Sequence, residues 1–259
     1  MPSPASKPSI VLVPGALHTP QAYHPLTSAL RSHGYKVLPV SLPSIGHDAS
    51  SFPPSGIADV TAVRAVIAQC VDRGEEVMVL MHSLGGVIGS EACKGLVQTH
   101  SEQGGVLKLF FMSGCLVPEG EHVGRYLEGK FGGFGSYVVF DVANGTVSVD
   151  LEQAAEFWWN GVSAQQVEEQ KEVLGGVKMS AGMTDCVVEY PAWKYVSSTY
   201  LLTEEDKSLL PDVQEGFTQL EGAEGVEVLR CEGGHCAWLS RTEEVVRAIR
   251  KAAGERVDA

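Results

Sequence analysis

The stretch VMVLMHSLGGVIGSEACKGL (residues 77–96) joins an apolar run to a glycine-rich segment with helical spacing, and Ser83 lies at the junction. A residue between the end of a strand and the start of a helix is held in a sharp turn. Such a turn exposes its side chain at the carboxyl edge of the sheet. The N-terminus of the helix then offers N–H groups to developing negative charge. This pattern predicts that Ser83 is a nucleophile.

The same stretch allows two other interpretations. Ser83 would suit the N-cap of the helix, but capping does not require the glycines at positions 85 and 86. The run LGGVIG (residues 84–89) lacks only the first glycine of the G-x-G-x-x-G dinucleotide fingerprint. That glycine makes the tight turn, and the next strand ends in Met112 and Ser113 without an acid for a ribose hydroxyl. Both alternatives explain this stretch less well than a nucleophilic role for Ser83 does.

A nucleophilic serine needs a base to take its proton, and the base needs an acid that fixes its tautomer. On a strand–serine–helix scaffold these partners follow in the order Ser, acid, His, each after a later strand. Asp206 follows the run STYLLT, with Glu204 and Glu205 as neighbours, and His235 follows the last predicted strand. Alone, each would suit an ordinary loop position, but together they predict a Ser83–His235–Asp206 triad.

An oxyanion hole needs two N–H donors, one from the residue after the nucleophile and one from the loop after an earlier strand. Leu84 supplies the first donor. The run VLVPGALHTP offers the second, because Gly15 lets the backbone turn so that the N–H of Ala16 faces the site. The alternative is a plain strand-to-helix turn at Gly15.

The charge of the chain limits its partners. The 259 residues carry a formal net charge of −13, and the 19 basic residues are scattered. This argues against binding to nucleic acid or to an anionic membrane surface. No apolar run approaches the roughly 18 residues of a membrane span, and the first ten residues lack the apolar core of a signal peptide. We expect a soluble, cytoplasmic protein, and a homodimer is left open.

Six cysteines lie far apart, mostly inside apolar segments, which favours buried free thiols over disulfides. Cys231, His235 and Cys236 are close in sequence, but no second Cys or His pair at ligand spacing accompanies them. The sequence therefore predicts neither a metal site nor a cofactor.

Short apolar runs alternate with helical patterns through most of the chain. The runs expected to form strands are residues 9–15, 35–43, 76–83, 106–114, 198–203 and 226–230, the first four of them buried on both faces. Helices are expected near residues 21–32, 57–73, 84–98 and 207–220, and from Arg241 onward. This alternation predicts an α/β fold, a mostly parallel sheet with helices on both faces.

Residues 119–193 follow a different pattern. Two alternating segments flank Asn144 and Gly145, which indicates a hairpin. Two short amphipathic helices are expected to begin at the N-caps Asp150 and Ser163.

This pattern predicts an inserted cap of a hairpin and short helices (residues 119–193) over a core domain made of residues 1–118 and 194–259. The aromatic side chains of the cap are expected to lie mostly in its own core, and some of them to line the substrate pocket. They are Phe131, Phe134, Phe157, Trp158 and Trp159.

With these residues in place, the chain resembles the α/β-hydrolases, and within them the group of plant methyl-ester esterases and hydroxynitrile lyases with related fungal and bacterial hydrolases. The likeness covers most of the chain and is specific in four segments. They are VPGALHTPQAYHPLTSALRSHGYKVLPVSLPSIG, MHSLGG, TEEDKSLLPDVQ and GGHCAWLS. The resemblance implies the same roles: Ser83 as nucleophile, Asp206 as acid, His235 as base, and the N–H groups of Ala16 and Leu84 as the oxyanion hole.

Two positions depart from the pattern of that group. Met81 stands where G-x-S-x-G has its first glycine, so the turn at Ser83 is expected to be more crowded, although Gly85 keeps the opposite position empty. Pro14 stands where many relatives have histidine before the oxyanion glycine. Because the N–H of Ala16 serves the hole, we expect this proline to be tolerated.

Together these features predict a cofactor-independent serine hydrolase, an esterase or lactonase that cleaves a small, fairly apolar carboxylic ester or lactone through an acyl-enzyme. Two alternatives stay open: a lyase or cyclase that uses the same triad without acylation, and a non-catalytic receptor for a small ligand. In the lyases of the resembled group a lysine directly follows the catalytic histidine, whereas this chain has Cys236 there.

Overall fold

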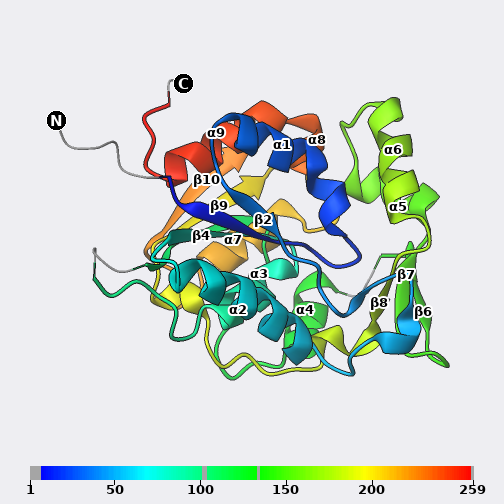
Figure 1. The fold of residues 1–259 in the computed structure, drawn as a ribbon. Helices are drawn as coiled ribbons and strands as arrows, with labels where there is room; N and C mark the ends of the chain where they lie inside the picture. Colours follow the sequence, from blue (N-terminus) through cyan, green and yellow to red (C-terminus); the bar gives the residue numbers. More distant parts are fainter. Residues whose placement is uncertain (1–6, 101–103, 133–134, 258–259) are drawn as a thin grey trace.

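The computed structural model describes residues 7–100, 104–132 and 135–257, and its centre is a parallel β-sheet (Figure 1). Within the described residues this sheet has six strands in the order β10-β9-β5-β4-β1-β2, and every neighbouring pair runs parallel. The strands are β1 (Ser9–Val13), β2 (Val37–Pro39), β4 (Glu76–His82), β5 (Gly105–Met112), β9 (Ser198–Thr203) and β10 (Val226–Cys231). The predicted α/β fold is confirmed.

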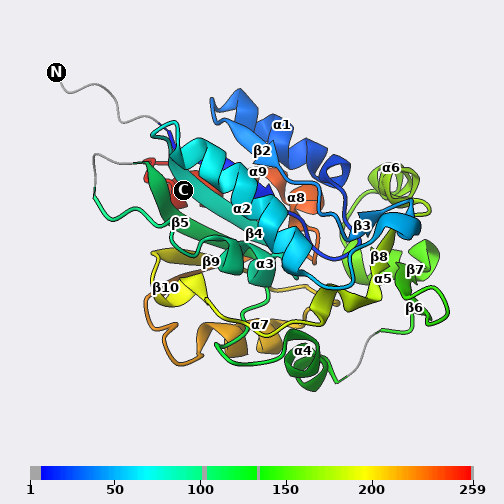
Figure 2. The same ribbon diagram turned by 60° about the horizontal axis from the view of Figure 1, so that its bottom comes forward.

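Helices cover both faces of this sheet (Figures 1 and 2). On one face lie α1 (His24–Ser32), α8 (Ala237–Ser240) and α9 (Thr242–Ala252), and on the other α2 (Ile57–Val71) and α3 (Gly85–Ala92). Between these layers the side chains of β1 and β9 are buried along their whole length, as apolar strands inside a parallel sheet must be. Within the described residues, no helix combines the length and apolar composition needed to cross a bilayer.

Two helices differ from the predicted ranges. The helix expected over residues 84–98 ends at Ala92, because Gly95 takes a left-handed conformation (φ 72°) and Val97 then bridges to Val106 beside β5. The helix expected from residue 207 begins only at Pro211, as α7 (Pro211–Thr218). Proline suits the first turn of a helix, where its missing N–H costs no hydrogen bond.

A second sheet is antiparallel and lies beside α5 and α6 (Figure 2). Its order is β3-β8-β7-β6, with β3 (Ile45–Gly46), β8 (Lys178–Ser180), β7 (Thr146–Val149) and β6 (Val138–Asp141). The hairpin of β6 and β7 at Asn144 and Gly145 is confirmed. Strand β3 was not expected here, because it follows β2 in the chain and has only two residues.

Three helices belong to the region around this second sheet: α4 (Val123–Phe131), α5 (Leu151–Trp158) and α6 (Ala164–Leu174). The predicted N-caps are confirmed, since the Asp150 side chain accepts from the N–H groups of the first turn of α5 and Ser163 does so for α6. Helix α4 was missed. Short 3-10 turns complete the chain: Pro20–Tyr23, Ala49–Ser51, Ala181–Thr184 and Ala192–Lys194.

Candidate active site

Ser83 stands in a strained turn between β4 and α3. Its φ of 50° is unusual for a residue with a side chain, and two backbone bonds hold it: the Ser83 carbonyl accepts from Gly86 N–H (3.0 Å) and from Cys115 N–H (2.8 Å). The glycines after Leu84 are required by close packing. A Cβ at Gly85 would lie 2.5 Å from the carbonyl oxygen of Pro14, and one at Gly86 would lie 2.5 Å from that of Cys115.

Met81, which departs from the G-x-S-x-G pattern, has room because of a different glycine. A Cβ at Gly89, one turn into α3, would lie 2.5 Å from the Met81 sulfur and 2.6 Å from its Cγ. The side chain of Met81 therefore occupies the space that a larger residue at position 89 would need. Met81 is fully buried, and the turn closes around Ser83 despite the missing glycine.

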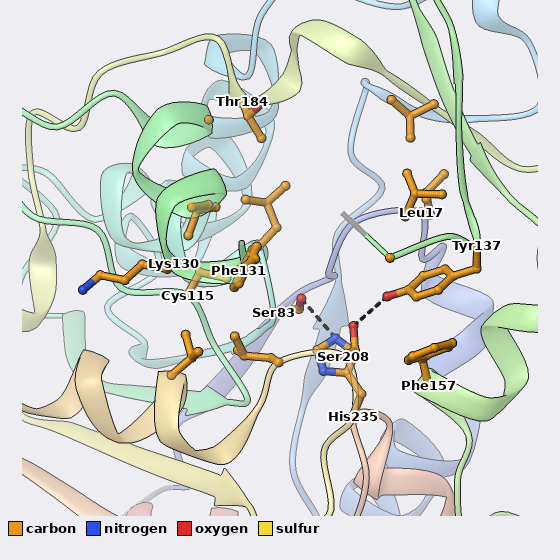
Figure 3. A pocket seen from close by; sticks show the side chains of 18 of the residues that line it. Leu17, Ser83, Cys115, Lys130, Phe131, Tyr137, Phe157, Thr184, Ser208 and His235 are labelled. Carbon is orange, nitrogen blue, oxygen red and sulfur yellow. Dashed lines mark hydrogen bonds between the residues drawn. The ribbon is translucent and has the colours of Figure 1, made fainter. Parts of the chain in front are cut away.

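The three residues of the predicted triad form one hydrogen-bonded chain, of which Figure 3 shows the bond between Ser83 and His235. His235 Nδ1 lies 2.8 Å from Asp206 Oδ2, and His235 Nε2 lies 3.1 Å from Ser83 Oγ. A carboxylate can only accept, so Nδ1 carries the proton and Nε2 is left to accept from the Ser83 hydroxyl. Both His235 and Asp206 are buried, at 4% and 2% exposure.

Asp206, and neither neighbouring glutamate, reaches His235. Its Oδ1 accepts from the backbone N–H groups of Ser208 and Leu209 (both 2.8 Å), which orients the carboxylate. Glu204 and Glu205 are exposed. These contacts also explain why residues 206–209 form a turn rather than the first turn of α7.

The turn after β1 packs directly against the nucleophile turn. A Cβ at Gly15 would lie 2.9 Å from Ser83 Cβ, and Leu17 has a positive φ of 60°. The backbone N–H groups of Ala16 and Leu84 have no acceptor among the residues that the structure describes. Both N–H groups are therefore available as donors, as the predicted oxyanion hole requires.

Beneath the site, a buried chain of hydrogen bonds joins Gly15 to the His235 loop. His82 Nε2 lies 3.1 Å from the carbonyl oxygen of His235, which can only accept, so Nε2 carries the proton. Burial, with His235 and His18 nearby, holds the pKa of His82 well below 6.5, and its ring is neutral. Its Nδ1 therefore accepts from the Tyr23 hydroxyl (2.8 Å), which in turn accepts from Gly15 N–H (2.9 Å).

A second buried histidine has the opposite tautomer. His18 Nδ1 lies 2.8 Å from the carbonyl oxygen of Ala16 and donates to it, which leaves Nε2 to accept from the Cys236 thiol at 3.6 Å. Burial lowers the pKa of His18 to about 4 and raises that of Cys236 well above 9, so both are neutral. This pair ties the Ala16 turn to the residue after His235.

Ser83 and His235 open onto a cavity of about 370 Å³. Apolar side chains from α4, β6, β7, α5 and β8 line one side of it, among them Leu127, Val147 and Met179. Of the five aromatic residues expected in this region, Phe131 and Phe157 line the cavity. Trp158 and Trp159 are buried behind the wall, and Phe134 lies outside the described residues.

Comparison with known proteins identifies the family of the chain. Residues 10–248 match the model of the family described as "Alpha/beta hydrolase family". The chain belongs to the alpha/beta hydrolase family. It is 33% identical to the "Alpha/beta hydrolase nvfD" of Aspergillus novofumigatus over 258 residues, covering 97% of this chain and 99% of that protein.

Solved structures of other α/β-hydrolases share the fold. Polyneuridine aldehyde esterase superimposes with a TM-score of 0.72 at 21% identity, over 95% of this chain and 99% of that one. Tomato methylketone synthase I, complexed with 2-tridecanone, superimposes with a TM-score of 0.74 at 17% identity, over 96% and 98% of the two chains. The resemblance to plant esterases and fungal hydrolases is confirmed at the level of family and fold.

Sequence reasoning missed several residues of this α/β-hydrolase site. Helix α4, which supplies Leu127 and Phe131 to the wall, had a readable signal, since its apolar residues recur at helical spacing and Gly132 ends it at φ 68°. Tyr137 and Ser208, which also line the cavity, had none. Neither did the contact between Tyr23 and His82, because it joins residues 59 positions apart.

Proposed function

We propose that this α/β-hydrolase cleaves a small, fairly apolar carboxylic ester or lactone, with Ser83 as nucleophile, His235 as general base and Asp206 as its anionic partner. One observation carries the proposal. The hydrogen-bonded chain from Asp206 through His235 to Ser83 ends at the floor of an apolar cavity. This arrangement suits acyl transfer, because the base can take the proton of the nucleophile and the cavity can bind the acyl group.

The reaction would proceed in two balanced halves. Ser83 Oγ attacks the carbonyl carbon while His235 Nε2 takes its proton, and the oxyanion accepts hydrogen bonds from the N–H groups of Ala16 and Leu84. The carbonyl re-forms as the alcohol leaves with the proton from His235, which gives an acyl-enzyme. Water, deprotonated by His235, then attacks the acyl carbon, and Ser83 leaves with that proton.

The size and lining of the cavity support a small substrate. A volume of about 370 Å³ lies near the lower end of the roughly 300–1,000 Å³ that small-molecule sites occupy. Its aliphatic and aromatic wall favours apolar groups on both sides of the ester. Residues 119–193 would then act as the cap that closes over the acyl group.

The residue after His235 favours hydrolysis over cyanohydrin cleavage. An anion leaving into an apolar cavity needs a nearby positive charge, because isolated charge is costly there. Cys236 is buried, and burial keeps its thiol neutral by raising its pKa well above 9. We expect no release of cyanide from mandelonitrile or acetone cyanohydrin above the buffer rate.

The experiment that tests the proposal combines labelling with turnover. A fluorophosphonate probe should modify the wild-type protein at Ser83 alone, and a panel of short-chain esters and lactones should include substrates that it hydrolyses. The matched control for a Ser83→Ala variant is Ser90→Ala, which removes a buried hydroxyl of α3 that has no partner within the described residues. A wild-type protein that is neither labelled nor active on any ester or lactone would identify a non-catalytic receptor instead.

A further inference from the structure

Two hydroxyl groups interrupt the apolar wall of the cavity beside Ser83. Tyr137, just before β6, and Ser208, two residues after Asp206, both line the cavity, and their oxygens lie 3.1 Å apart. Figure 3 shows the Tyr137 hydroxyl directed at Ser208. This hydroxyl pair belongs to neither the proposed triad nor the proposed oxyanion hole.

The pair has one more hydrogen than it can use internally. Each hydroxyl carries one hydrogen, and the bond between them uses one of the two, whichever group donates. Neither oxygen has a second acceptor among the residues that the structure describes. One O–H is therefore left to donate within the described structure; Tyr137 is only 6% exposed and Ser208 is half-buried. A donor shielded from water in this way is costly unless an acceptor reaches it.

The hydroxyl pair is also held in a fixed position. The ring of Tyr137 stacks on Phe157 with centroids 4.8 Å apart, and Trp158 meets it edge-on at 5.8 Å. The backbone N–H of Ser208 donates to Asp206 Oδ1 at 2.8 Å, so the Ser208 loop is anchored to the proposed acid. A donor fixed in a mainly apolar wall discriminates between ligands more strongly than a mobile one.

We propose that the Tyr137–Ser208 pair is a specificity-determining element that donates a hydrogen bond to a second oxygen of the substrate. The preferred substrate is then an apolar ester or lactone that carries an ether, carbonyl or hydroxyl oxygen a few bonds from the scissile carbonyl. An ester without this oxygen would leave the O–H without a partner and would react more slowly. This inference rests on the proposed ester hydrolysis and refines its substrate class.

The test is a scan of the substrate with oxygen. Matched esters are compared in which one CH₂ of the acyl chain, or of the alcohol chain, is replaced by an ether oxygen at each position in turn. For each pair, kcat/KM of the oxygen-containing ester is divided by that of the all-carbon ester. The wild-type ratio is then divided by the ratio for Tyr137→Phe and for Ser208→Ala, which cancels the intrinsic reactivity of each ester.

We expect at least one oxygen position for which both variants lose a preference of about tenfold, the size expected of one hydrogen bond. The loss is read from the ratio of the two esters within each variant, so a change that affects all esters alike cancels. Tyr137→Phe keeps the stack on Phe157, and Ser208→Ala keeps the backbone bond to Asp206. Tyr195→Phe, which removes an exposed hydroxyl, is the control and should change no ratio.

Two results would overturn the inference. The first is that no oxygen position shows a preference that the variants abolish. The second is that both variants slow every ester by the same factor, in which case the Tyr137–Ser208 hydrogen bond only connects the β6 hairpin to the Asp206 loop. In either case hydrolysis of all-carbon esters and labelling of Ser83 would still stand. Loss of those two would instead remove the proposed function itself.

Discussion

The two sides of the cavity are built by different interactions. On the side of the parallel sheet, Tyr23, His82 and His235 sit in hydrogen bonds whose direction is fixed by groups that can only donate or only accept. On the other side, the wall from α4, the second sheet and α5 consists mainly of apolar side chains such as Leu127 and Met179. The sheet side therefore fixes the positions of the reacting atoms, and the wall determines the shape of the cavity.

This difference teaches where sensitivity to substitution lies. A directional hydrogen bond fixes the reacting atoms closely, and a small displacement is costly in the transition state. Apolar contacts in a wall are less directional and tolerate exchange at similar volume. Substitutions on the sheet side should therefore lower kcat, and those in the wall should mainly change KM.

Ser83→Ala should have the largest effect. Loss of the nucleophile is expected to lower ester turnover on the order of 10⁴-fold or more, because the remaining site can only bind and polarise the ester. The removed oxygen leaves little empty space, so the thermal midpoint and ligand binding should stay close to those of the wild type. Turnover retained in Ser83→Ala but lost in Ser90→Ala would place the nucleophile elsewhere.

Asp206→Asn should come next, with kcat lowered roughly 10⁴-fold because His235 loses its anionic partner. Glu205→Gln is the matched control, since Glu205 is exposed and does not contact His235. Steady-state kinetics of the two variants on one ester would decide the assignment. A large effect of Glu205→Gln with a small effect of Asp206→Asn would reverse it.

The buried histidines should make the fold sensitive to mild acid. The pKa of His18 is about 4 in the folded chain against 6.5 when unfolded, so the unfolded chain binds more protons below pH 6.5 and stability falls as pH falls. From pH 7 to pH 5 this amounts to about 2 kcal/mol for His18. The pKa values of Glu75 and Glu255 are about 2 in the folded chain. Their contribution to the free energy of unfolding is therefore lost only below about pH 4.5, outside this range.

Urea unfolding at pH 7, 6 and 5 measures this effect. His18→Gln should show a shallower loss of unfolding free energy over that range than the wild type does. His33→Gln, at an exposed histidine, should keep the wild-type slope. Equal slopes for wild type and His18→Gln would show that His18 does not stay neutral in the folded protein.

Tyr23→Phe tests the buried hydrogen bonds beneath the site. The variant leaves Gly15 N–H and His82 Nδ1 without their partner, so the turn that carries Ala16 is expected to shift. We expect kcat to fall about tenfold while KM stays within about twofold, because the loss falls on the transition state. Tyr35→Phe also loses a hydrogen bond, to Glu255 far from the site, and should leave kcat unchanged. A parallel rise in KM would point to general loosening of the fold.

Phe131→Leu should have the smallest effect and the opposite kinetic signature. Phe131 lines the wall, and leucine keeps most of its apolar contact with an acyl chain. We expect KM to rise about threefold with kcat unchanged, since apolar contact is shared by the bound ester and the transition state. A fall in kcat of tenfold or more would show that the wall also orients the reacting atoms.

The sequence predicted the sheet side of the site better than the wall. Ser83, Asp206 and His235 each follow a strand, so local pattern and chain order were enough to place them at one sheet edge. The wall depends on how α4 and the second sheet fold back over that edge, which local pattern does not encode. Strand β3, only two residues long, joins β8 from a distant part of the chain and gave no periodic signal.

The buried hydrogen bonds could not be predicted for a related reason. His18 and Cys236 are 218 residues apart, and a histidine before the nucleophile reads as an ordinary strand residue. The hydrogen bonds of His18 and His82 depend on the tautomer of each ring. In the folded chain these tautomers are set by the carbonyl oxygens of Ala16 and His235. Chemistry of this kind is visible only once the loops are placed.

The fit of Met81 against Gly89 also constrains how this turn can evolve. Because the Met81 sulfur fills the space that a Cβ at position 89 would need, Gly89→Ala alone would force the buried Met81 side chain to move, two residues before Ser83. If Met81→Gly comes first, it empties that space, and alanine at 89 then fits. The two positions are therefore epistatic: alanine at 89 is compatible with the G-x-S-x-G form, which Met81→Gly alone creates, but not with Met81 in its present place.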